Sequence, residues 1–139
     1  MKAEMMPQRQ TKRSCGYDIY AEKNIVIKKG VWQIVNTHVR FDGSEKILDC
    51  DKWFAMIVPR SSYGFKYRLR FSNTVAIIDQ DYRDDILLEM TADEDIEIKK
   101  GERYAQFIII PFAVFMNEIT PVADRIGGLG STTKQVRFD

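Results

Sequence analysis

Residues 54–85 read FAMIVPRSSYGFKYRLRFSNTVAIIDQDYRDD, and they contain two short apolar runs separated by a polar segment. The runs at 54–58 and 74–78 have the length and composition of buried β-strands. Between them, residues 61–66 are compatible with a short helix. This stretch therefore predicts a strand, one or two helical turns and a second strand.

The rest of the chain continues the pattern of short strands broken by turns. Further strand-like runs are residues 18–21, 25–27, 31–35, 86–90, 96–98 and 104–111. No window keeps a helical period beyond a turn or two. Many short strands at turn-punctuated spacing predict a single all-β domain, either a sandwich or a barrel.

One hexapeptide occurs twice in similar form, as IVIKKG at 25–30 and IEIKKG at 96–101. We interpret both copies as strands that enter glycine-containing hairpin turns, in preference to a true internal repeat.

Composition narrows the class of protein. The 139 residues suffice for one domain with a sizeable core, and 45% hydrophobic with 29% charged residues is typical of soluble globular proteins. A net charge of +1 does not indicate sequence-independent binding to nucleic acid. Cys15 and Cys50 cannot build a disulfide framework, and His38 has no ligand-spaced neighbour, so we expect it to be structural.

The first residues of the chain and the length of its apolar runs indicate where in the cell we expect the protein. No apolar segment approaches the roughly 20 residues that span a bilayer, and MKAE at 1–4 does not begin a signal peptide. We expect a soluble, cytoplasmic protein with neither a membrane nor a nucleic-acid partner.

Polar side chains follow both runs of the 54–85 stretch. Arg60, Ser61 and Ser62 offer a guanidinium fork and hydroxyl donors to phosphate oxygens. The second run leads to Asp79, with Tyr82 three residues later. A carboxylate at a strand end, with a ring to lie against a sugar or base, suits general-base attack on a bound nucleotide.

Five segments, taken in order, resemble the trimeric dUTP diphosphatases (dUTPases). They are SCGYDI at 14–19, PRSS at 59–62 with Lys66, Asn73 with IIDQDYR at 77–83, GERYAQF at 101–107, and Arg125 with GGLGST at 127–132. The resemblance extends from about residue 7 to residue 133. It implies a jelly-roll-like β-barrel or sandwich over residues 1–124, a mobile C-terminal arm over 125–139, and a homotrimer with sites shared between subunits.

The resemblance also implies the reaction, hydrolysis of dUTP to dUMP and pyrophosphate. Asp79 matches the aspartate that deprotonates the water attacking the α-phosphorus. Tyr82 matches the ring that packs on deoxyribose and excludes a ribose 2′-hydroxyl. Asn73, together with the backbone around Ile77 and Ile78, matches the groups that read uracil.

Further residues match the groups that bind phosphates and Mg²⁺. The phosphate-binding set comprises Arg60, Ser61 and Ser62. The arm that closes over the γ-phosphate contributes Arg125, Leu129, Ser131 and Thr132. Asp18 and Gln106 match groups that position the waters around Mg²⁺, while the triphosphate itself ligates the ion.

The chain departs from the family pattern at a few places. Leu129 stands where a phenylalanine usually stacks on the uracil, so the arm retains apolar cover without stacking. Smaller departures are the short spacing between Arg125 and Gly127 and non-glycine residues at 76, 84 and 133.

Two alternatives remain open at this point. A dCTP deaminase of the same fold is supported by Glu89, ten residues after Asp79, and opposed by Phe65, where that branch has arginine. No histidine lies at 74–79, which also opposes it. The other alternative is a nucleotide-sensing regulatory trimer that acts through a protein partner, although a pure binder would not need Asp79.

Overall fold

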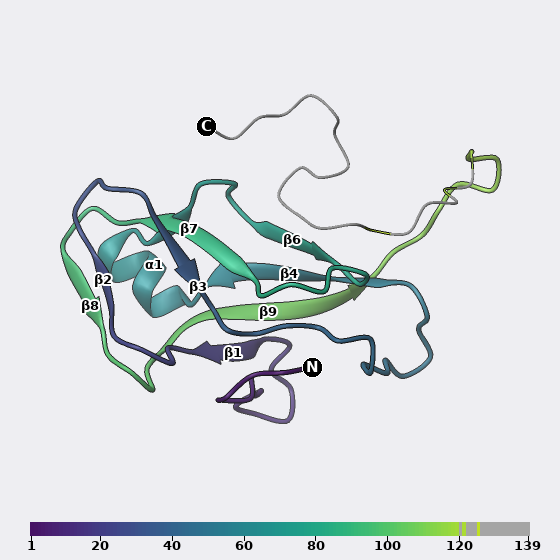
Figure 1. Ribbon diagram of the computed structural model, residues 1–139, viewed down its shortest axis with the longest axis horizontal. Coiled ribbons are helices and arrows are strands. Elements are labelled where there is room, and N and C mark those ends of the chain that lie inside the picture. Colours follow the sequence, from purple (N-terminus) through teal and green to yellow (C-terminus); the bar gives the residue numbers. More distant parts are fainter. Residues whose placement is uncertain (120, 122–124, 126–139) are drawn as a thin grey trace.

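The computed structural model describes residues 1–119, 121 and 125, and the strands in this part of the chain form three antiparallel sheets (Figure 1). The first has the order β1-β9-β4-β6, with bounds Tyr17–Tyr20, Arg103–Pro111, Trp53–Pro59 and Ala76–Asp79. The second pairs β2 (Ile25–Ile27) with β8 (Ile96–Ile98). The third has the order β3-β7-β5, with bounds Gln33–Asn36, Leu87–Thr91 and Arg70–Phe71.

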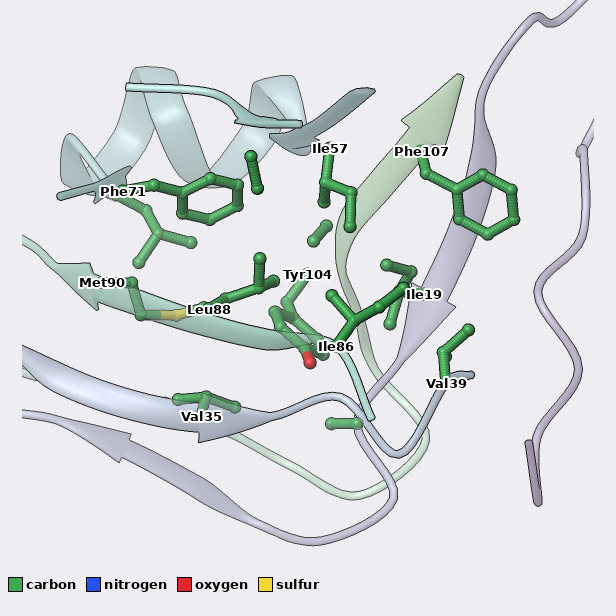
Figure 2. Close-up of a cluster of buried hydrophobic side chains, with 14 of the residues drawn as sticks. Ile19, Val35, Val39, Ile57, Phe71, Ile86, Leu88, Met90, Tyr104 and Phe107 are labelled. Atoms are coloured by element: carbon green, nitrogen blue, oxygen red, sulfur yellow. The ribbon is translucent and has the colours of Figure 1, made fainter. Parts of the chain in front are cut away.

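The core consists of apolar side chains that alternate along these strands. In β4, Ala55 and Ile57 are fully buried while Phe54 and Met56 are half-buried, as expected when successive side chains face opposite sides of a sheet. Figure 2 shows Ile57 gathered with Leu88 of β7 and with other buried side chains. The predicted all-β, jelly-roll-like fold is confirmed.

The two copies of the hexapeptide pair with each other. Strands β2 and β8 run antiparallel, so each copy supplies half of the two-stranded sheet. Gly30 and Gly101 end the copies with φ of +69° and +88°, a region that favours glycine. The expected hairpins are wrong, because β3 pairs with β7 and β9 pairs with β1 and β4.

Element boundaries differ slightly from the prediction. The strand expected at 31–35 begins at Gln33, because the Val31 N–H donates to the Lys28 carbonyl in a turn. The short helix α1 forms over Ser61–Tyr67 and ends at Arg68, whose φ is 55°. Strand β5 was not predicted, since two residues carry no period. Within the described residues, no helix is long and apolar enough to cross a membrane.

Candidate active site

Three of the five sequence segments meet at one end of the first sheet. Asp18 of β1 lies opposite Gln106 of β9, and Gln106 lies opposite Val58 near the end of β4. Arg60, directly after β4, places its Nε 3.1 Å from Oδ1 of Asp18. The structure therefore brings together the arginine predicted to bind phosphate and the two residues predicted to position the waters around Mg²⁺.

A second arginine completes this group. Nη1 of Arg103 lies 3.2 Å from Oδ2 of Asp18, so the carboxylate sits between two guanidinium groups. Asp18 is only 5% exposed, and a buried carboxylate is stable when it is paired in this way. We call Asp18, Arg60, Arg103 and Gln106 the Asp18 cluster.

Arg103 was not among the predicted site residues, although it lies in the fourth segment. Regular alternation along β9 places it on the opposite face from Gln106. The β1–β9 register shifts between Ile19 and Tyr20, as at a β-bulge, and this irregularity lets Arg103 reach Asp18. The signal in the sequence was its place in the segment GERYAQF, three residues before Gln106.

Gly16 of the first segment leaves room for the Gln106 side chain. A Cβ atom at this position would lie 2.1 Å from Oε1 of Gln106. A side chain at this position would therefore displace the Gln106 amide from its place beside β1.

The two serines of the second segment begin α1, and both are exposed. The preceding residue, Arg60, occupies the N-cap position with an extended backbone, and its N–H donates to the Tyr104 carbonyl at 3.1 Å. This bond ties the start of α1 to β9 and holds Arg60 against the Asp18 cluster.

The third segment lies elsewhere. Asp79 ends β6, opposite Phe54 at the start of β4, and its side chain is 57% exposed. Arg125 binds Asp79 through Nη2 and binds Oδ1 of Asp81 through Nε at 2.7 Å. Its hydrogen bond to Asp81 raises the pKa of the Arg125 guanidinium. A cavity of about 250 Å³ is lined by Asp79, Gln80, Asp81, Phe112 and Arg125.

The remaining residues of the third segment flank Asp79. Tyr82 is half-buried against the core, and its N–H donates to the Asp79 carbonyl at 3.1 Å. Asn73 is exposed in the turn before β6, where Thr74 has a φ of 67°. In β6, Ile77 is exposed and Ile78 partly buried.

Asp79 and Arg60 lie far apart within one chain. The two residues lie at opposite ends of β4, because Asp79 pairs with Phe54 and Arg60 follows Pro59. At about 3.3 Å per residue, the separation along the strand is roughly 20 Å. Leu129, Ser131 and Thr132 lie outside the described residues.

Two of the departures from the family pattern are accommodated. Ala76 is buried in β6 opposite Ile57, and neither Ala76 nor Asp84 is among the residues with positive φ. The backbone at these positions therefore does not require glycine.

The oxygen donors of the Asp18 cluster suit a hard cation that keeps its waters. Asp18 supplies a carboxylate and Gln106 a carboxamide oxygen, and these face each other across the β1–β9 ladder. Within residues 1–119, 121 and 125, no group of three or more His, Cys, Asp or Glu side chains is arranged to hold a metal. A magnesium ion here would need further ligands, such as phosphate oxygens and water.

The fold and these groups define a jelly-roll-like β-protein with an acidic and arginine-rich site at its strand ends. A family model described as dUTPase matches residues 2–133. The chain belongs to the dUTPase family.

Curated relatives agree with this assignment. The chain is 34% identical to the deoxyuridine 5′-triphosphate nucleotidohydrolase of Nautilia profundicola, over 94% of this chain and 92% of the relative. It is also 34% identical to the protein of the same name from Rickettsia felis, over 91% of this chain and 87% of the relative.

Solved structures share the fold. The dUTPase from Streptococcus mutans matches with a TM-score of 0.64 and 26% identity, over 78% of this chain and 87% of that chain. The dUTPase of Staphylococcus bacteriophage 80alpha matches with a TM-score of 0.67 and 22% identity, over 93% and 91% of the two chains.

Proposed function

We propose that this protein is a dUTP diphosphatase, which hydrolyses dUTP to dUMP and pyrophosphate. Family membership and relatives matched along nearly their whole length support the activity. The observation that carries the chemistry is Asp79, an exposed carboxylate at a strand end with the half-buried Tyr82 ring three residues on.

Asp79 acts as the general base. It accepts a proton from the water that attacks the α-phosphorus, as a carboxylate within hydrogen-bond reach of that water can do. Arg60 neutralises charge on the phosphates, and Ser61 and Ser62 donate hydrogen bonds to phosphate oxygens. The contact with Asp18 orients Arg60 for this task.

Magnesium is the proposed cofactor. When bound, it offsets the charge of the triphosphate and orients the phosphates. Asp18 and Gln106 bind waters of the ion, while substrate phosphates are its main ligands. The Asp18 carboxylate accepts a hydrogen bond from Arg103 and forms an ion pair with Arg60, so its remaining lone pairs serve the water.

Base and sugar are recognised by the third segment. The side chain of Asn73 and the backbone at Ile77 and Ile78 read the uracil. The Tyr82 ring packs on deoxyribose and leaves no room for a 2′-hydroxyl.

A homotrimer provides the complete site. Asp79 of one subunit meets the Asp18 cluster of another, because the two groups lie at opposite ends of β4 within one chain. Exposed apolar side chains support association, since large apolar patches mark protein contacts. They occur at Val31, Trp32 and Ile34 and again at Phe112, Val114, Phe115, Met116 and Ile119.

The C-terminal arm, residues 125–139, is proposed to close over the substrate. Arg125, Ser131 and Thr132 bind the γ-phosphate, and Leu129 covers the uracil. In the structure, the Arg125 guanidinium binds Asp79 and Asp81. To bind the γ-phosphate instead, the same side chain would have to leave these two carboxylates.

The deaminase alternative rested on Glu89. Glu89 is exposed on β7 and lies opposite Ile34, which is 69% exposed, so it lies on the outer face of its sheet. The comparisons favour neither this alternative nor the regulatory trimer.

The test is a nucleotide panel with Mg²⁺ containing dUTP, dCTP, dTTP and UTP, scored for both pyrophosphate and ammonia. We expect pyrophosphate from dUTP, far less from the other three nucleotides, and no ammonia from dCTP. Ammonia from dCTP at a rate comparable with pyrophosphate from dUTP would overturn the proposal, as would the absence of pyrophosphate from dUTP.

A further inference from the structure

The turn that follows β6 is held by a segment outside the five family-like stretches. At the Asp79 end, the Gln80 amide accepts from the Trp53 N–H at 2.9 Å and donates to the Asp51 carbonyl at 3.1 Å. Asp51 lies in the long connection between β3 and β4, and Trp53 is the first residue of β4. The same connection holds the Tyr82 end of the turn through different residues.

Asp85 links Tyr82 to this connection. The Tyr82 hydroxyl donates to the backbone carbonyl of Asp85 at 3.1 Å. The Asp85 carboxylate accepts from Nδ2 of Asn36 at 3.1 Å, and Nε of Arg40 lies 3.7 Å from its Oδ1. Nδ1 of His38 lies 3.9 Å from its Oδ2. We call Asn36, His38, Arg40 and Asp85 the Asp85 anchor.

The anchor is itself built on a fixed backbone. The His38 N–H donates to Oδ1 of Asn36 at 2.7 Å, which stabilises His38 in a left-handed conformation with φ of 57°. Buried Thr37 donates to the Ile86 carbonyl from both its N–H, at 3.0 Å, and its hydroxyl, at 2.8 Å. These bonds fix the register of residues 36–40 against Asp85.

The Tyr82 hydroxyl keeps the proton that this contact needs. Burial, together with the nearby Asp84 and Asp85 carboxylates, raises the pKa of the Tyr82 phenol. The hydroxyl is therefore a donor throughout the neutral pH range, and the Asp85 carbonyl is its acceptor.

We propose that Asp85, held by Asn36, His38 and Arg40, is a positioning residue that fixes the Tyr82 ring and sets the discrimination between deoxyribose and ribose nucleotides. The inference rests on the proposed role of Tyr82 as the wall against the sugar. A ring excludes a 2′-hydroxyl by steric contact, so it discriminates only if it cannot retreat. The hydroxyl contact and the anchor remove that freedom at the far end of the ring.

The experiment compares kcat/KM for dUTP and UTP in Tyr82→Phe, Asp85→Ala and the double variant. Tyr82→Phe keeps the ring and removes its hydroxyl contact, while Asp85→Ala keeps the hydroxyl and removes the carboxylate that fixes the loop. We expect each single variant to lower the dUTP/UTP ratio about three- to tenfold, the usual effect of one lost hydrogen bond. Most of the change should be a gain in kcat/KM for UTP.

The double variant tests whether the two residues act in one chain of contacts. Coupled residues are not additive, so the double variant should lose no more selectivity than the stronger single variant. Asp85→Asn keeps an acceptor oxygen for Asn36 and should restore part of the ratio lost in Asp85→Ala. The matched control is Asp84→Ala, which removes an exposed carboxylate from the same turn and should leave the ratio unchanged.

The outcomes separate the anchor from the role of Tyr82. If Tyr82→Ala lowers the ratio while Tyr82→Phe and Asp85→Ala leave it unchanged, the positioning role of Asp85 is wrong. The steric role of the Tyr82 ring against the ribose 2′-hydroxyl is then retained. If Tyr82→Ala also leaves it unchanged, both are overturned, although dUTP hydrolysis by the wild type still supports the proposed activity. Should Asp85→Ala unfold, as judged by thermal denaturation, Tyr82→Phe decides alone.

Discussion

Two aspartates in this protein differ mainly in their surroundings. Asp18 is buried between Arg60 and Arg103, so both of its oxygens are engaged by guanidinium groups. Asp79 is more than half exposed and pairs with the Arg125 guanidinium. A paired, buried carboxylate is suited to orienting its partners, whereas an exposed carboxylate can receive a proton from water.

Asp79→Asn tests this division. Because the amide cannot accept a proton, we expect kcat to fall by roughly 10²–10⁴ while nucleotide binding is largely retained. The measurement is steady-state pyrophosphate release together with calorimetric binding of a non-hydrolysable dUTP analogue. A variant that keeps more than about a tenth of wild-type kcat would assign the base to another group.

Gly16→Ala tests the close approach at the first segment. The added Cβ would lie 2.1 Å from Oε1 of Gln106, so the flexible amide must move away from β1. We expect a loss of activity that exceeds any loss of stability, with the apparent Mg²⁺ requirement raised several-fold. Titration of activity with Mg²⁺, beside thermal denaturation, measures both effects. Normal activity at low Mg²⁺ would show that Gln106 is not needed where the structure has it.

At the scale of single elements, β7 shows how alternation assigns roles. Leu88 and Met90 are buried in the core, and Glu89 between them is exposed. Its neighbour across the ladder is Ile34 of β3, also exposed. The strand therefore places its one carboxylate outside the core of the chain.

Glu89→Gln should accordingly keep dUTP hydrolysis within a few-fold of wild type. An exposed, isosteric change is usually worth less than about 0.5 kcal/mol. The same assay scored for ammonia from dCTP should show none in either protein. If the wild type released ammonia and the variant did not, Glu89 would be the catalytic acid of a deaminase.

At the scale of the whole molecule, strand β4 separates the two groups of residues to which the proposed chemistry is assigned. Its start lies beside Asp79 and its end leads into Arg60, which leaves about 20 Å between them at the rise of a strand. A general base must come within hydrogen-bond distance of the water it activates. Under the proposed mechanism, a second subunit is therefore expected to complete the site.

Complementation between subunits tests this arrangement. Asp79→Asn and Arg60→Ala homo-oligomers should both be nearly inactive, whereas mixed trimers contain some interfaces with an intact pair. We expect the mixture, after subunit exchange, to recover a clear fraction of wild-type activity. Light scattering should report a mass three times that of the 16.2 kDa chain. Mixed trimers without recovered activity, or a fully active monomer, would contradict the shared site.

Some of this could be predicted from local sequence alone. Apolar alternation and turn residues located most strands and α1, because these signals come from residues close together in the chain. The positions of Arg60 and Asp79 at strand ends could likewise be predicted, since each follows an apolar run, while their chemical roles stay predictions. The roles of Leu129, Ser131 and Thr132 stay predictions, because these residues lie outside the part of the chain that the structure describes.

Other features depended on contacts between distant residues. The pairing of β2 with β8, the register shift that brings Arg103 to Asp18, and the Asp85 anchor each join segments far apart in the sequence. Local periodicity carries no information about which strand lies beside which, nor about an irregularity in one ladder. Those contacts exist only once the chain has closed on its core, so the tertiary structure alone decided which side chains hold Arg60 and Tyr82 in place.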